Sequence, residues 1–303
     1  MKTEIRKIAY KGWENCIELS NGIVSLIITT DVGPRIMHYG FVNDRNEFNI
    51  WENQLGQTGG DEWKCYGGTR LWHGPEIGQR CYEPDNDPVS WDAVENGVLL
   101  KQNEEPVSHI AKEMSVSLNP DKSEVDLRFK LTNSGMWNVE LCIWILSLLE
   151  GGGLEIIPRK KYIADIPPNG ILPNGAIAYW PYTNMGDSRL RISDEYILLQ
   201  HDRSIKQSFK IGLPVEDGWA AYINDGHMFV KQYTHIRNAI YPDYCSSFET
   251  YLNDSYTEME TLSPMRVLAP GESIEHFETW KLFDGIRMPD TEADIGSLIH
   301  LIK

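Results

Sequence analysis

Residues 67–76 hold the densest set of side chains that could do chemistry, and they read Gly-Gly-Thr-Arg-Leu-Trp-His-Gly-Pro-Glu. The glycines allow the backbone to turn sharply or to approach a ligand closely. Arg70 can donate two parallel hydrogen bonds to hydroxyl or carboxylate oxygens, and Trp72 can stack on the face of a sugar. His73 titrates near neutral pH and can act as a general acid or base. The structural alternative is a buried tryptophan beside a hydrogen-bonded histidine in a rigid loop.

A metal site in this segment would use His73 and Glu76 as ligands. The chain has 8 histidines, none of them in a His-x-His or His-Glu-x-x-His pattern, which are the spacings of common metal sites. The sequence also lacks a Gly-x-Ser-x-Gly elbow, a Gly-x-Gly-x-x-Gly turn and a phosphate-binding loop. We therefore expect neither a metal nor a nucleotide cofactor.

A second candidate is the acidic pair Glu258 and Glu260 in the run Tyr-Thr-Glu-Met-Glu-Thr-Leu-Ser-Pro. On a strand, side chains two residues apart point to the same face. Two carboxylates that lie close together raise the pKa of at least one of them, which suits general acid–base catalysis. A solvated edge strand in an acidic protein is the alternative.

Four more polar residues lie in or beside strand-like runs and could bind a ligand oxygen. Asp243 precedes one such run, and Glu249 lies within it. Lys231 interrupts another apolar run, and Arg35 follows an early strand. Each of these side chains could equally face solvent, so the sequence leaves both interpretations open.

These candidates lie among short segments in which apolar and polar residues alternate, the pattern of a strand with one buried face. The clearest example is Val-Asp-Leu-Arg-Phe-Lys-Leu at residues 125–131. Asn-Asp-Gly at residues 224–226, between two such segments, predicts a hairpin. Many short strands with few helices predict an all-β fold, either a sandwich or a barrel. The other expected strands are residues 23–29, 114–118, 141–149, 196–200, 208–213, 219–224, 228–233, 248–252 and 274–282.

A single helix is expected near the C-terminus, over residues 290–302, with Asp290 or Thr291 as its N-cap. Residues 52–91 show little periodicity, and we interpret them as a long irregular segment that carries functional residues. The proline- and glycine-rich residues 167–175 are expected to form a long loop, since strand patterning continues on both sides. We therefore expect residues 1–303 to form one domain.

The composition limits the function classes. The chain has 303 residues, with 28 Lys and Arg against 44 Asp and Glu, a formal net charge of −16. This charge disfavours nucleic acids and anionic membranes as partners, because binding them needs a basic surface. We expect no signal peptide, and no apolar run approaches the roughly 20 residues of a membrane span. Five cysteines without a Cys-x-x-Cys pair favour reduced thiols and a cytoplasmic location.

Several short motifs, in this order, resemble the galactose mutarotase-like superfamily, whose best known members are the aldose 1-epimerases. Residues 20–36 resemble its opening strands with a glycine before an Arg-Ile pair, and residues 71–74 resemble its His-Gly loop. Residues 131–135 resemble its central strand ending in Thr-Asn, and residues 260–273 resemble its closing strand and Leu-x-Pro-Gly-Glu turn. The Gly-Gly-x-Arg-Leu-Trp-His-x-Pro-Glu and Glu-Thr-Leu-Ser-Pro stretches are most similar to an uncharacterised bacterial branch. The resemblance covers roughly residues 20–283, and it implies a β-supersandwich of two large antiparallel sheets with a sugar site on a concave face.

In aldose 1-epimerases a glutamate takes the proton of the anomeric hydroxyl group, and a histidine protonates the ring oxygen. The resemblance implies that Glu260 is this base. The histidine position falls at Trp144 in this chain, which has no histidine between His109 and His201. Either His73 supplies the proton, or the mutarotase reaction is lost.

The expected function is that of a cytoplasmic carbohydrate-active protein, an aldose 1-epimerase-like mutarotase with Glu260 as base and His73 as acid. A non-catalytic sugar-binding or sensing domain is one alternative, favoured by Trp144. A glycoside hydrolase or lyase is another, with Glu76 or Glu249 facing Glu260 across the sugar. The residues expected to bind the sugar are Arg35, Arg70, Trp72, Glu76, Lys231, Asp243 and Glu249. The three cations among them could together bind an acidic sugar, against the bulk field of an acidic protein.

Overall fold

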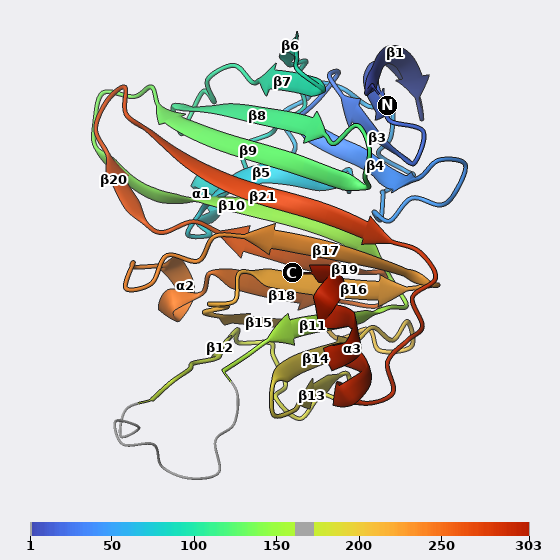
Figure 1. Cartoon of the computed structure of the whole chain (residues 1–303). Helices are drawn as coiled ribbons and strands as arrows, with labels where there is room; N and C mark the ends of the chain where they lie inside the picture. The colour runs from blue at the N-terminus through green and yellow to red at the C-terminus, as the bar shows by residue number, and fades with distance from the viewer. Residues whose placement is uncertain (1, 161–172, 303) are drawn as a thin grey trace.

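The computed structural model describes residues 2–160 and 173–302, which form two large sheets packed face to face (Figure 1). All pairings between their strands are antiparallel. This arrangement confirms the expected all-β supersandwich. Side chains from the two inner faces fill the space between the sheets and form one large apolar core.

The first sheet has 11 strands among the described residues, and distant parts of the chain meet at its centre. Its strands, in spatial order, are β1 (Glu4–Tyr10), β2 (Trp13–Ser20), β3 (Val24–Thr29), β4 (Arg35–Phe41), β5 (Thr69–Gly74), β10 (Val139–Glu150), β19 (Tyr256–Leu262), β18 (Phe248–Leu252), β15 (Phe209–Leu213) and β12 (Ala178–Tyr179), with β20 (Arg266–Leu268) paired to β10.

The second sheet has 10 strands in the described part of the chain, and it lies in front of the first sheet in Figure 1. Its strands, in spatial order, are β13 (Leu190–Ile192), β14 (Tyr196–Gln200), β11 (Leu154–Pro158), β16 (Trp219–Asn224), β17 (His227–Tyr233), β21 (Ser273–Phe283), β9 (Glu124–Asn133), β8 (Ile110–Leu118), β7 (Gly97–Lys101) and β6 (Ser90–Val94). The helical segments are α1 (Gly78–Cys81), α2 (Pro242–Cys245) and α3 (Glu292–Ile302).

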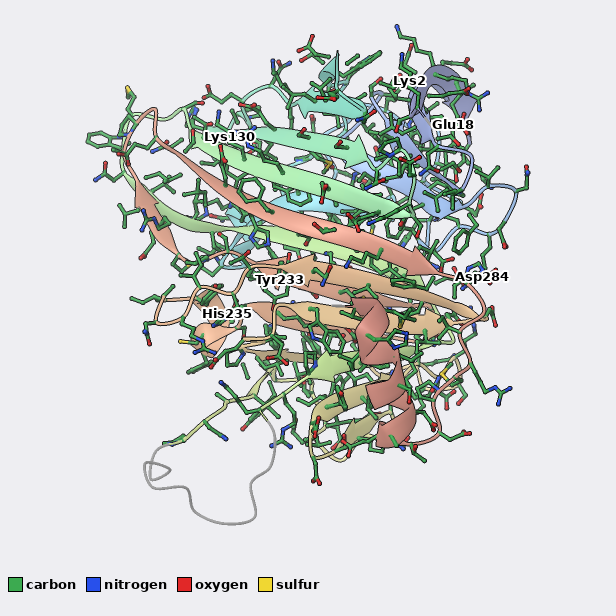
Figure 2. All side chains as sticks on the ribbon, viewed as in Figure 1. Lys2, Glu18, Lys130, Tyr233, His235 and Asp284 are labelled. Carbon is green, nitrogen blue, oxygen red and sulfur yellow. The ribbon has the colours of Figure 1, made fainter. Side chains whose placement is uncertain are left out.

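Strand β9 shows how the alternating pattern builds this sandwich. Val125, Leu127 and Phe129 are buried in the core between the sheets. Lys130 alternates with them and points to the outer face of the second sheet (Figure 2), where its ammonium group pairs with Glu113 of β8 at 2.9 Å. The burial of apolar surface from both sheets is the main force that holds them together.

Helix α3 packs on the outer face of the second sheet, in front of β16 in Figure 1. Ile295 and Ile302 are buried in an apolar cluster that includes Trp219. At the start of the helix, Asp294 N–H donates to Thr291 Oγ1 at 3.3 Å, and Thr291 N–H donates to the Asp294 carboxylate at 2.9 Å. This reciprocal pair is a capping box, so the expected helix and its N-cap at Thr291 are confirmed.

Several expected strands and the expected hairpin coincide with the structure. The strands expected at residues 196–200, 219–224 and 248–252 are β14, β16 and β18 with the same bounds. Asn224 pairs with His227 across a two-residue turn, in which Asp225 and Gly226 both have positive φ. This is the backbone that an Asn-Asp-Gly hairpin turn needs.

The segment 52–91 differs from its expected irregular conformation, because it contains β5 next to the centre of the first sheet. All six residues of β5 are buried. A strand covered on both faces does not show the alternation that marks a half-exposed strand. The glycines at its start are needed for close packing, since Gly68 has a φ of +69° and a Cβ there would lie 2.2 Å from the carbonyl oxygen of Ile36.

Three other sequence expectations concern loops, thiols and membranes. The expected loop at residues 167–175 falls mostly on residues 161–172, which lie outside the described residues. The five cysteines are free thiols; Cys245 is exposed and the other four are buried. No helix in the described part of the chain is both long enough and apolar enough to cross a membrane.

Candidate functional site

A pocket of about 280 Å³ opens on the outer face of the first sheet, opposite the face that packs on the second sheet. Strand register decides which side chains reach it. Trp72 of β5 pairs with Trp144 of β10, and Arg70 pairs with Leu146. Because side chains alternate along a strand, these residues share one face with Glu258 of β19, and all of them line the pocket.

Aromatic rings form most of the pocket wall. Trp72 packs edge-on against Trp144 with ring centroids 5.3 Å apart, and Trp63 and Tyr82 pack against Trp72. Flat apolar rings with a few polar groups between them suit the C–H faces and hydroxyl groups of a sugar. The remaining aromatic residues of the wall are Trp51, Tyr182, Tyr251 and Tyr256.

Glu258 and Glu260 lie on the same face of β19, as their spacing predicts, and of the two only Glu258 lines the pocket. Burial raises the pKa of Glu258 to about 7, and direct interaction with the neighbouring Glu260 carboxyl group adds to this rise, against the pull of Arg70. A carboxyl group with this pKa is partly protonated near neutral pH. It is therefore suited to proton transfer with a bound ligand.

Glu260 is fully buried beside the pocket, and two donors hold one of its oxygens. The indole N–H of Trp144 donates to Glu260 Oε2 at 2.8 Å, and the ammonium group of Lys210 donates to the same atom at 2.9 Å. These two hydrogen bonds fix the orientation of the Glu260 carboxyl group. Glu260 is thus held in a defined position next to Glu258.

Lys210 of β15 connects two carboxylates, since its Nζ also lies 2.8 Å from Glu249 Oε2 of β18. Glu249 stands directly opposite Glu260 in the register of β18 and β19. Burial alone would lower the pKa of Lys210, but the two carboxylates outweigh it and raise the pKa well above its ordinary value. Lys210 therefore stays charged and stabilises two glutamates that would otherwise repel each other.

Asp243 extends this cluster on the side of Glu249. Burial raises the pKa of both carboxyl groups, and their direct interaction and the charge of Glu260 contribute to the rise for Glu249. The pair therefore holds a proton more firmly than isolated carboxyl groups do. Residues 243–245 have φ values of 49°, 58° and 72°, so α2 is a left-handed turn rather than a regular helix. Strained backbone of this kind is frequent at functional sites.

The motif at residues 67–76 contributes three of its expected side chains to the pocket. Arg70, Trp72 and Glu76 line it, and Glu76 accepts a hydrogen bond from the Tyr82 hydroxyl group at 2.5 Å. The guanidinium carbon of Arg70 lies 4.1 Å from the ring centroid of Trp72 and 5.1 Å from that of Trp63. Glu249 and Asp243 belong to the adjoining carboxyl cluster.

His73 is not at the pocket, which corrects its expected role as the acid. It alternates with Arg70 and Trp72 along β5 and pairs with Ile143, so its side chain lies on the opposite face of the sheet from Glu260. There its Nε2 lies 3.5 Å from Glu105, which is itself paired with Lys112. Burial lowers the pKa of His73. The histidine is a neutral core residue.

Arg35 and Lys231 are also absent from the pocket lining, and both are fully buried. Arg35 donates to the Cys65 carbonyl oxygen at 2.7 Å and pairs with Asp85 at 2.9 Å, so it fixes the segment before β5. Lys231 lies between the sheets, where its Nζ is 3.1 Å from Glu278. The expectation that these cations bind the sugar is wrong, because internal partners already hold both of them.

Lys210 and the pocket residues Trp51 and Tyr182 are not among the residues that the sequence predicts for the site. Lys210 occupies the polar position of an alternating run, Phe-Lys-Ile-Gly-Leu, and the same pattern predicts a solvent-exposed lysine. Only the pairing of β15 with β18 brings Lys210 next to Glu249 and Glu260. No signal in the sequence distinguishes these aromatic residues from ordinary core residues.

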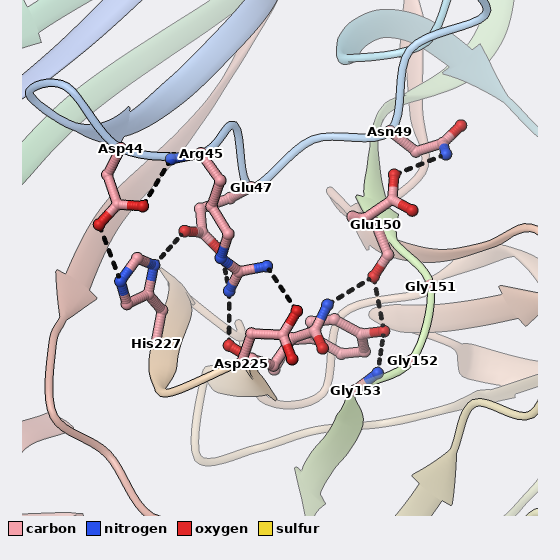
Figure 3. Close-up of polar contacts among 12 residues, drawn as sticks. Asp44, Arg45, Glu47, Asn49, Glu150, Gly151, Gly152, Gly153, Asp225 and His227 are labelled. Atoms are coloured by element: carbon pink, nitrogen blue, oxygen red, sulfur yellow. Dashed lines mark hydrogen bonds and ion pairs between the residues drawn. The ribbon is translucent and has the colours of Figure 1, made fainter.

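A second polar cluster joins residues 44–47 to the hairpin of β16 and β17 (Figure 3). Its residues are not among those that line the pocket. His227 Nδ1 lies 2.6 Å from Glu47, and Arg45 donates to Glu47 at 3.1 Å and to the Asn224 carbonyl oxygen at 2.5 Å. These contacts fasten a loop of the first sheet to a hairpin of the second sheet.

Among the described residues, no group of three or more His, Cys, Asp or Glu side chains is arranged to hold a metal ion.

No protein-family model matches the sequence, and no curated protein matches it. Solved structures do resemble this chain. A TPR-domain-containing protein from Parabacteroides distasonis superposes with a TM-score of 0.59 at 14% identity over 91% of this chain. The chain spans about half of that protein, 49% of its length.

Two further structures match over nearly their whole length. A Salmonella typhimurium protein provisionally described as a mutarotase gives a TM-score of 0.59 at 9% identity, covering 93% of this chain and 94% of its own. A galactose mutarotase-like protein from Lactobacillus casei gives a TM-score of 0.56 at 11% identity, covering 89% of this chain and 100% of its own. These likenesses show the fold, a β-sandwich similar to that of the galactose mutarotase-like protein and the other two structures.

Proposed function

We propose that this chain is a mutarotase-like enzyme that opens the ring of a free sugar by proton transfer at Glu258. The observation that carries the proposal is a carboxyl group with a pKa of about 7 in an aromatic pocket, held against a second, fully buried carboxylate. The structural likeness to mutarotase-like proteins supports the choice of a sugar as the ligand. The aromatic wall supports it independently.

Ring opening moves two protons around one carbon atom. The anomeric hydroxyl group loses its proton, the ring oxygen gains one, the bond from the anomeric carbon to the ring oxygen breaks, and an aldehyde forms. Both oxygens are attached to the anomeric carbon, so one neutral carboxyl group can serve both. Its carbonyl oxygen accepts the hydroxyl proton while its O–H gives a proton to the ring oxygen. The carboxyl group ends neutral, with the proton on its other oxygen.

This assignment removes the need for a separate histidine acid. Closure of the ring on the other face of the aldehyde gives the other anomer, by the same two transfers in reverse. Glu258 is then the catalytic residue, and Glu260 is a positioning residue in place of the expected base. Its carboxyl group, held by Trp144 and Lys210, contributes to the raised pKa of Glu258 and so helps to keep the proton there.

The glycoside hydrolase alternative fits less well. The carboxyl groups of Glu258 and Glu260 interact directly, whereas the two carboxyl groups of a glycosidase stand about 5 Å or more apart across the sugar. Glu249 is held by Lys210 at 2.8 Å and is buried. A non-catalytic sugar-binding domain is the remaining alternative, and the cytoplasmic location stays a prediction.

The experiment that tests the proposal is anomeric exchange measured by NMR across neutral, phosphorylated and acidic aldoses. Wild type should accelerate exchange of at least one sugar, and Glu258→Gln should lower that rate by about 10²-fold or more. Glu113→Gln, a half-buried change on the second sheet, is the matched control and should leave the rate unchanged. Binding without faster exchange, or full activity in Glu258→Gln, would contradict the proposal.

A further inference from the structure

Arg70 is a buried cation at the pocket without a matching hydrogen-bonded anion. Its side chain is about 95% buried, and its guanidinium group stacks on Trp72 and lies near Trp63. The nearest carboxylate, Glu258, lies 3.8 Å from Nη2, which is beyond hydrogen-bond distance. Among the described residues, Arg70 donates through Nη1 to the Cys65 sulfur at 3.4 Å, and a thiol sulfur is a weak acceptor.

Two hydrogen-bond donors of this region lack a partner. Arg70 Nε and the indole Nε1 of Trp63 are both buried, and neither donates to any described residue. Both side chains line the pocket. Lys210, the other pocket cation described, differs because its ammonium group already contacts two carboxylates, those of Glu249 and Glu260.

Unpartnered donors of this kind are rare in folded proteins, because a buried polar group without a partner is costly and a buried charge more so. Glu258 compensates the charge only in part, since its raised pKa leaves it substantially protonated near neutral pH. A ligand group that only accepts hydrogen bonds and carries one negative charge would satisfy both donors. A carboxylate has these properties, and its two oxygens match the fork of a guanidinium group.

We infer that the pocket takes a sugar acid whose carboxylate binds Arg70 and Trp63 while its anomeric centre faces Glu258. This inference rests on the proposed function and names the substrate class of the same site. A phosphate fits less well, because the described part of the pocket offers no second free cation for its second charge. Of the three cations considered from the sequence, Arg70 alone lines the pocket.

The inference links binding to catalysis. The charge of Arg70 lowers the pKa of Glu258, against the larger effect of burial. A ligand carboxylate neutralises that charge, so binding should raise the pKa of Glu258 further and favour its neutral form. A neutral sugar would not produce this change.

The test compares D-galacturonate and D-glucuronate with D-galactose, D-glucose and D-glucose 6-phosphate by calorimetry and NMR exchange. Wild type should bind at least one uronate about 10-fold or more tightly than the matching neutral sugar. Arg70→Gln should abolish this preference and leave neutral-sugar binding weak but measurable, and Arg70→Lys should retain part of it. Arg128→Gln, a change in an exposed ion pair with Glu275, is the control and should keep the preference.

The outcomes separate the two proposals. Equal or tighter binding of neutral sugars by wild type overturns the sugar-acid inference while leaving mutarotation intact, and a preference for the phosphate does the same. A uronate preference that survives in a folded Arg70→Gln variant also overturns it. Absence of binding for every sugar overturns both. The wild-type comparison decides the matter even where a variant does not fold.

Discussion

The indole N–H of Trp144 donates a hydrogen bond of 2.8 Å to the buried carboxylate of Glu260. Trp144 occupies the place where the family resemblance puts a catalytic histidine. An indole nitrogen only donates a hydrogen bond and does not exchange its proton near neutral pH. In the proposed function, the site therefore uses Glu258 for both proton transfers and Glu260 to position it, instead of an acid and a base on two residues.

Trp144→Phe tests what this hydrogen bond does. The variant should lose about 1.5–3 kcal/mol of unfolding free energy, because a charged buried acceptor loses a donor. It should also weaken sugar binding or slow exchange, since Glu260 no longer holds the proton on Glu258 as firmly. Denaturant unfolding and NMR exchange measure the two effects.

Trp280→Phe is the matched control, because Trp280 donates to the buried Glu278 at the same distance, 2.8 Å, in the second sheet. It should cost a similar amount of stability and leave sugar exchange unchanged. If both variants keep normal exchange, Trp144 is only a structural donor. If both lose exchange equally, the effect comes from stability.

The pKa of Glu258 also predicts how stability depends on pH. Burial raises this pKa from its ordinary value of 4.5 to about 7, so between these values the folded state binds more protons than the unfolded state. Glu258 therefore destabilises the fold progressively as pH rises through this window. Glu258→Gln removes the effect, and its stability relative to wild type should improve from about pH 5 to about pH 8. A difference that stays constant across this range would contradict the assigned pKa.

Gly68 and Gly22 offer a test of how β5 enters the sheet. Both have positive φ, +69° at Gly68 and +84° at Gly22. A Cβ at Gly68 would lie 2.2 Å from a backbone oxygen, whereas a Cβ at Gly22 would have no atom within 4 Å. Gly22→Ala should cost about 1–2 kcal/mol of unfolding free energy, from backbone strain alone. Gly68→Ala should cost more than about 4 kcal/mol or prevent folding. Equal costs for the two variants would show that the close approach at Gly68 is relieved by a small shift.

The sequence predicted strands where apolar and polar residues alternate, as in β9, and also where a short run is almost wholly apolar, as in the fully buried β16. Residues 125–131 alternate and become β9, and the Asn-Asp-Gly turn becomes a hairpin. Strand β5 escaped prediction because it is buried on both faces and yet contains Arg70 and His73, so it shows neither alternation nor a continuous apolar run. The same loss of alternation hides which side of β5 each residue faces.

The candidate site was predicted where local spacing decides proximity and missed where sheet register decides it. Glu258 and Glu260 share a face because they are two residues apart on one strand. Lys210 reaches them only because β15 pairs with β18 and β18 pairs with β19. His73 was placed at the site by its motif, and alternation along β5 turns it away.

The measurement that tests the central claim most directly is the pH dependence of catalysed anomeric exchange, from about pH 5 to about pH 9. A neutral Glu258 that both gives and accepts a proton predicts a constant kcat/KM at low pH and a fall as pH rises through about 7. Neutral sugars do not titrate in this range, and a uronate is already ionised. A rate that instead rises through this pH would show an ionised carboxylate acting as base, and would contradict the account.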